Sequence, residues 1–154
     1  MTGLKLWPGV EIAVMTEGYE FFDHTADLGV CVSGATLSEL FTHAAQALTV
    51  AMGQLTTTDT GRERVLELQA GSVEDLLHDW LAELLFEIAA HHILYTPVVF
   101  VTIEPHRLTA NMRGGQIDFA RSRVNQEIKA VTYHRLQVEQ LPDTTWRAVV
   151  VFDV

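Results

Sequence analysis

Polar side chains gather in the segment 23–27, where Asp23, His24, Thr25 and Asp27 place two carboxylates, an imidazole and a hydroxyl in one short connection. Carboxylates and imidazoles are the groups that bind cations or transfer protons in proteins. Asp and Thr also form tight turns by hydrogen-bonding the local backbone. The spacing therefore leaves two interpretations open, a chemical site and a stabilised turn.

A second unusual carboxylate, Asp153, stands near the end of the apolar run Val149–Val154. If this strand ends beside Asp27, the two side-chain carboxylates and a main-chain or terminal oxygen of Val154 converge. Such an all-oxygen set suits a hard cation such as Ca²⁺ or Mg²⁺. The alternative is a solvated carboxylate on a C-terminal tail, and the sequence does not decide between them.

Lys129 follows Glu127 on the same face of an expected strand. The pair is either a surface ion pair or a way of presenting a fixed positive charge to a phosphate or carboxylate. His43 and His78 fall on the polar faces of expected helices, so no ligand role is assigned to them. A glycine-rich phosphate loop, a Gly-x-Ser-x-Gly motif and a His-Glu-x-x-His motif are all absent from the sequence, so the common enzyme templates do not apply.

The composition indicates one globular domain with an acidic surface. The chain has 154 residues, of which 48% are hydrophobic, and a formal net charge of −10. Strong unassisted nucleic-acid binding is not expected, because its affinity comes largely from basic side chains that neutralise phosphates. A basic macromolecular partner and a merely solubilising surface both remain consistent with this charge.

The single cysteine, Cys31, cannot form an intramolecular disulfide, which favours a reducing, cytoplasmic setting. The first twenty residues lack the basic start and continuous apolar run of a signal peptide. Segment 40–58 is uncharged, but polar residues interrupt it at helical intervals. It is therefore expected to be an amphipathic helix rather than a membrane span.

Two amphipathic helices are expected among several strands. The first helix begins at Thr36, which forms a capping box with Glu39, and ends at Gly53; the second begins at Ser72 and ends near His91. The expected strands share apolar alternation or β-branched residues, and they are 19–23, 28–33, 62–69, 98–103, 108–112 with a turn at Gly114–Gly115, 127–133, 136–139 and 146–152.

These elements predict an α+β fold, with two helices packed on a mixed, largely antiparallel sheet. The first eighteen residues show no periodicity and are interpreted as a loose tail. The expected domain then covers residues 19–154.

Three segments together resemble the archease family: YEFFDHTADLGV at 19–30, TLSELF at 36–41 and EIKAVTYH at 127–134, followed by Trp146 and the terminal Asp153–Val154. The resemblance runs from Tyr19 to the last residue. It implies an archease-like fold and a cytoplasmic accessory protein that is not itself an enzyme.

The activity that this resemblance implies is activation of the GTP-dependent tRNA-splicing RNA ligase. The accessory protein would promote guanylylation of the ligase's active-site histidine and allow multiple turnover. An alternative is a chaperone or specificity modulator of a tRNA cytosine methyltransferase. A third hypothesis, a metal-dependent phosphohydrolase, is disfavoured because such two-metal sites collect more carboxylates than Asp23, Asp27 and Asp153 provide.

The resemblance also assigns roles to individual residues. Asp27 is the motif aspartate, Asp153 the near-terminal aspartate and Lys129 the strand lysine, and these three would carry ligase activation. A divalent cation would be held by Asp27, Asp153 and Val154, with Ca²⁺ expected and Mg²⁺ or Mn²⁺ as alternatives. The secondary candidates, which a structural role would explain equally well, are Asp23, His24 and His134.

Overall fold

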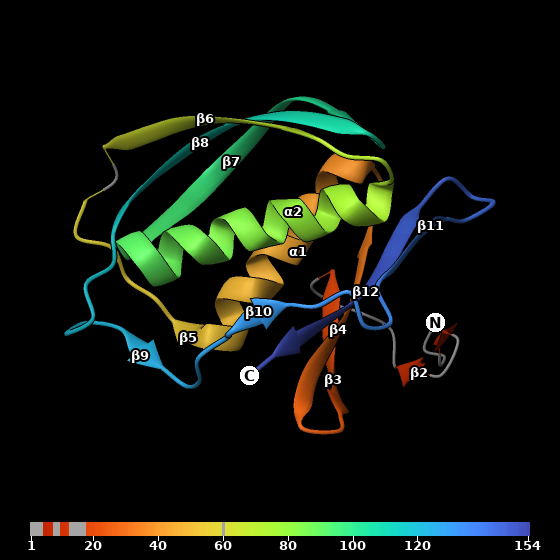
Figure 1. Cartoon of the computed structure of the whole chain (residues 1–154), viewed down its shortest axis with the longest axis horizontal. Helices are drawn as coiled ribbons and strands as arrows, with labels where there is room; N and C mark the ends of the chain where they lie inside the picture. Colours follow the sequence, from red (N-terminus) through yellow and green to blue (C-terminus); the bar gives the residue numbers. More distant parts are fainter. Residues whose placement is uncertain (1–4, 8–9, 13–17, 60) are drawn as a thin grey trace.

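Two layers of antiparallel strands enclose the two long helices of this chain, as the computed structural model in Figure 1 shows. The structure describes residues 5–7, 10–12, 18–59 and 61–154. Near the N-terminus, β1 (Lys5–Trp7) pairs with β2 (Val10–Ile12), and most of the remaining predicted tail lies outside the described residues. The domain boundary at residue 18 stays a prediction.

The five-stranded sheet forms the layer that contains the C-terminus. The strands of this sheet are β3 (Tyr19–His24), β4 (Asp27–Gly34), β10 (Ala130–Val131), β11 (Gln137–Gln140) and β12 (Trp146–Asp153). The strand order is β10-β12-β4-β3. The strand β11 also pairs with β12, along the same edge as β10 but at the other end of the strand.

The second layer is a three-stranded sheet in which β8 (Arg107–Gln116) lies between β6 (Arg62–Gln69) and β7 (Ile93–Glu104). Two shorter strands, β5 (Gly53–Gln54) and β9 (Arg123–Val124), pair with each other. Every strand pairing in the described part of the chain is antiparallel.

The helix ends follow the predicted caps. The Thr36 hydroxyl accepts a hydrogen bond from the Glu39 amide at 3.1 Å, and α1 (Leu37–Met52) ends at Gly53, whose φ of 143° favours glycine. The Ser72 hydroxyl caps α2 (Val73–Phe86), which continues as a π-helical turn, η1 (Glu87–His91). No helix among the described residues is long and apolar enough to cross a membrane.

The core lies where the two helices meet the sheets. The helix α1 contacts β4 and β7, and α2 contacts β6 and β10, so the helical layer joins both sheets. Trp80 is fully buried on α2, and its indole nitrogen donates a hydrogen bond to the Phe41 carbonyl on α1 at 3.0 Å. The predicted α+β fold with two amphipathic helices is confirmed.

Two predicted strand details are wrong. Gly114 and Gly115 form no turn, because they continue β8 and pair with Tyr95 and Leu94 of β7. A Cβ atom on Gly114 would lie 2.0 Å from the Leu94 carbonyl oxygen, so the glycine serves close backbone approach. The predicted strand 127–133 is reduced to β10, because the chain leaves the edge of β12 after Thr132 and turns at Arg135, where φ is 56°.

Candidate functional site at one end of the five-stranded sheet

The end of β12 brings the backbones of the three main predicted site residues together. On one side, Phe152 lies opposite Leu28 of β4, and the next step of this register places Asp153 beside Asp27. On the other side, Asp153 lies opposite Ala130, and its carbonyl accepts a hydrogen bond from the Lys129 amide at 2.7 Å. Figure 1 shows the C-terminal end of β12 near β10 and the hairpin of β3 and β4.

The two carboxylates lie on the same face of the sheet. Leu28 and Phe152 pack into the core beneath the helices, and Phe152 is fully buried. Because neighbouring residues in a strand point to opposite faces, Asp27 and Asp153 project from the outer face. Both residues are half-buried, so their negative charges are concentrated at the sheet rather than on free tails.

The hairpin between β3 and β4 holds Asp27 in place. Thr25 and Ala26 adopt positive φ values of 37° and 20°, and the Asp27 amide donates to the Thr25 carbonyl at 2.6 Å. This tight turn pairs His24 with Asp27 across the hairpin. The segment 23–27 is thus a turn that also presents a carboxylate.

His24 and His134, two of the secondary candidates, meet beside Asp27. Their ring centroids are 4.8 Å apart and the rings are tilted by 57°. The buried Nδ1 atom of His24 has no hydrogen-bond partner among the described residues. Asp23 is exposed and, by strand alternation, projects from the face opposite to that of His24, so the structure does not bring it together with Asp27.

Hydrogen bonds at Thr132 hold the segment that carries Lys129 and His134 against β12. The Val151 carbonyl accepts bonds from the Thr132 amide at 3.0 Å and from the Thr132 hydroxyl at 2.8 Å. The same hydroxyl accepts a bond from the His134 amide at 3.2 Å. Lys129 itself is exposed, so its ammonium is accessible while its backbone is held against β12.

Reasoning from the sequence missed His78. Its Nε2 atom lies 2.9 Å from the Val131 carbonyl oxygen, and its ring stacks on Tyr133 with centroids 3.9 Å apart. These contacts join α2 to β10 and to the segment after it, and a helical pattern gives no signal for a partner more than fifty residues away. His78 therefore packs against β10 and Tyr133 and does not lie on a free polar face of α2.

Burial shapes the chemistry of two groups near the site. Cys31 is fully buried in the middle of β4. Burial raises the pKa of its thiol from 9.0 to about 11. The pKa of Tyr133 is raised above its usual 10.0, mainly by desolvation and to a lesser extent by the nearby carboxylates of Asp79 and Asp75. Both groups are neutral at pH 7.

The donor atoms at the end of β12 fit a hard cation that keeps several water ligands. Among the described residues, no three His, Cys, Asp or Glu side chains form a metal-binding group. Asp27 and Asp153 supply two carboxylates, while the Asp153 carbonyl is already bonded to the Lys129 amide. Val154, the predicted main-chain donor, directly follows Asp153 in the chain, and an all-oxygen set of this kind would suit Ca²⁺, Mg²⁺ or Mn²⁺.

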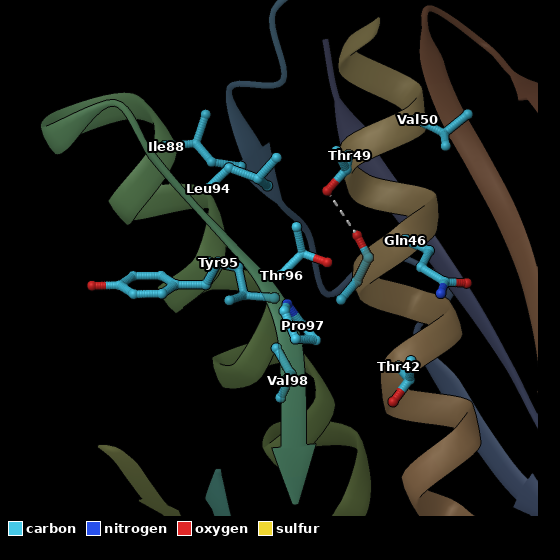
Figure 2. Close-up of a pocket in the computed structure, with 12 residues that line it drawn as sticks. Thr42, Gln46, Thr49, Val50, Ile88, Leu94, Tyr95, Thr96, Pro97 and Val98 are labelled. Atoms are coloured by element: carbon cyan, nitrogen blue, oxygen red, sulfur yellow. Dashed lines mark hydrogen bonds between the residues drawn. The ribbon is translucent and has the colours of Figure 1, made fainter. Parts of the chain in front are cut away.

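A pocket of about 280 Å³ lies elsewhere, between α1 and β7 (Figure 2). Its lining is largely apolar, and the Thr49 hydroxyl is bonded to the Ala45 carbonyl at 3.1 Å. Asp27, Lys129 and Asp153 are not among its lining residues. The candidate site is therefore an exposed sheet end rather than an enclosed pocket.

The chain matches the Archease protein family from residue 19 to residue 154, a range that includes all the site residues described above. This chain belongs to the archease family. The protein archease of Thermococcus gammatolerans is 32% identical over 139 residues, which cover 88% of this chain and 98% of that protein. The protein archease of Methanosarcina barkeri is 34% identical over 142 residues, which cover 88% and 95%.

Solved archease structures share the fold. The solution structure of Protein 1598 from Methanobacterium thermoautotrophicum aligns with a TM-score of 0.69 and 28% identity, covering 90% of this chain and 100% of that one. A Thermotoga maritima structure described as an archease and possible chaperone aligns with a TM-score of 0.64 and 28% identity, covering 86% and 94%. The predicted resemblance to archeases is confirmed.

Proposed function

We propose that this archease activates a GTP-dependent tRNA-splicing RNA ligase by promoting guanylylation of the ligase's active-site histidine. The observation that supports this proposal most strongly is the convergence of Asp27, Lys129 and Asp153 at one sheet end. Nucleotidyl transfer depends mainly on positioning and on stabilising charge at the phosphates. A sheet end that carries two carboxylates, with an exposed lysine on the adjoining segment, offers groups for both tasks.

Each residue then has a distinct task. The exposed Lys129 ammonium contacts a phosphate oxygen of the bound nucleotide or a carboxylate of the ligase. Asp27 and Asp153 orient a divalent cation, together with Val154, or a basic side chain at the ligase's nucleotide site. A bound cation would neutralise charge that develops on the phosphates during transfer. We propose Ca²⁺ as the resident ion, with Mg²⁺ or Mn²⁺ as alternatives.

The acidic character of the chain supports a protein partner. Its net charge of −10 favours approach to a basic surface and disfavours direct binding to RNA. The archease would thus act on the ligase and not on the RNA substrate. It would work as an activator in the cytoplasm and have no catalytic activity alone.

A chaperone or specificity modulator of a tRNA cytosine methyltransferase is the second candidate function. The Thermotoga maritima relative is described as a possible chaperone, which favours a protein-binding role of this kind. A metal-dependent phosphohydrolase is not proposed, because Asp23 projects away from the face that carries Asp27 and Asp153.

The test is single-turnover guanylylation of the host's RNA ligase with and without this protein. We expect wild type to accelerate the reaction, and Asp27→Ala, Lys129→Ala and Asp153→Ala each to reduce the acceleration by about tenfold or more, because a lost charge-positioning group costs that much in transfer reactions. Glu67→Ala is the matched control, because Glu67 is an exposed strand carboxylate in the other sheet. Absence of acceleration by wild type would favour methyltransferase binding instead.

A further inference from the structure

His78 connects α2 with the two-residue strand β10. Its Nε2 atom lies 2.9 Å from the Val131 carbonyl oxygen, and its Nδ1 atom lies 3.1 Å from a carboxylate oxygen of Asp79. The ring also stacks on Tyr133, with an angle of 16° between the two planes. The side chain of His78 is only 17% exposed, so these contacts define a single ring position.

The position of β10 explains why it needs this contact. Thr132 bonds inward to β12, so Val131, the residue before it, turns its carbonyl outward, away from β12. Val131 is 7% exposed, and a buried carbonyl without a partner is costly. His78 supplies the donor that a neighbouring strand would otherwise provide, and it thereby fixes the outer edge of β10.

The Val131 contact defines which ring nitrogen acts as the donor. A carbonyl oxygen only accepts hydrogen bonds, so the Nε2 atom of His78 must carry the proton that this contact needs. The neutral tautomer with its proton on Nε2 and the imidazolium both meet this requirement.

We propose that His78 is a positioning residue that holds β10, and with it Lys129, in the geometry that activation requires. Only the link from Lys129 to ligase activation rests on the proposed function. Lys129 directly precedes β10 and is anchored on its inner side by the Asp153 carbonyl. The inner bond and the His78 bond together hold the lysine backbone between β12 and α2.

Two further side chains fix the orientation of the His78 ring. Asp79 contacts it from α2, and Tyr133 stacks on it from the segment after β10. Without His78, the bonds from β12 alone would hold β10.

The first part of the test needs no ligase. In the full chain, hydrogen exchange at a single pH measures the protection factors of the Lys129 and Thr132 amides. His78→Ala should lower these two protection factors at least tenfold and leave that of the Leu40 amide of α1 unchanged. His78→Gln, which keeps a side-chain N–H donor, should restore the protection at least partly.

The second part uses guanylylation of the RNA ligase. His78→Ala should reduce the acceleration by about tenfold, and His78→Gln should recover it at least partly. Adding His78→Ala to Lys129→Ala should cause little further loss, because both changes act through the same lysine. Unchanged protection of the Lys129 and Thr132 amides in His78→Ala overturns the role of His78. Absence of acceleration by wild type overturns the proposed function and leaves the exchange result valid.

Discussion

Cys31 shows how strongly the sheet beneath the acidic residues excludes solvent. It lies opposite Val149 of β12 and Glu20 of β3, and its side chain is fully buried. Burial raises the pKa of the thiol to about 11, and the charges of Arg135 and Arg147 only partly oppose this effect. The thiolate, which is the reactive form, is therefore scarce at neutral pH.

We expect Cys31 in the folded chain to react with a thiol reagent at pH 8 at least about 100-fold more slowly than in urea, because the thiol is both neutral and inaccessible. The raised pKa also contributes stability that is fully present below pH 9.0, the ordinary value, and is lost as the pH rises through about 11. Urea unfolding of wild type and Cys31→Ala between pH 8 and pH 11 checks the sign. A stability difference that moves in favour of wild type as the pH rises would contradict this account.

Single residues differ in how far the sequence could assign them. Asp27 was a candidate because it lies in a polar connection, and Asp153 because a carboxylate is unusual at the end of an apolar strand. The sequence left their convergence as one of two alternatives, and the resemblance to archeases favoured it. His78 was not found, because its partner Val131 belongs to a distant segment. Tertiary contacts of this kind leave no local pattern in the chain.

At the scale of elements, the helices were predictable and one strand was not. Apolar spacing and the Thr36 and Ser72 caps located α1 and α2 nearly to the residue, because these signals are local. The strand β10 is shorter than its apolar pattern indicates, because contacts with β12 and α2 decide where it ends. Pairing across a sheet thus limited the prediction of strand lengths.

The cap of α2 offers a test of this helix, which carries both Trp80 and His78. The Ser72 hydroxyl accepts a hydrogen bond from the Asp75 amide at 3.1 Å. Replacing Ser72 with Ala removes this acceptor and should lower the free energy of unfolding by about 1 kcal/mol. Urea denaturation measures the change, and Ser38→Ala, a substitution within the first turn of α1, serves as the control. A loss as small as that of the control would argue against a stabilising cap.

At the scale of the whole molecule, the site depends on how the chain closes on itself. The last strand, β12, lies between β4 from the start of the domain and β10 from its final third, and the helices hold both neighbours from one side (Figure 1). Asp27, Lys129 and Asp153 are distant in sequence and adjacent only in this sheet. The α+β class followed from local patterns, whereas the assembly of the site required the fold.

The most direct test of the proposed function is a double-mutant cycle on Asp27 and Asp153 in single-turnover guanylylation of the RNA ligase. If the two carboxylates act as one unit at the sheet end, Asp27→Asn and Asp153→Asn should each remove most of the acceleration, and the double variant should lose little more than either alone. Circular dichroism would confirm that all three variants are folded. Independent losses that multiply in the double variant, or a wild-type protein that does not accelerate the reaction, would contradict the account.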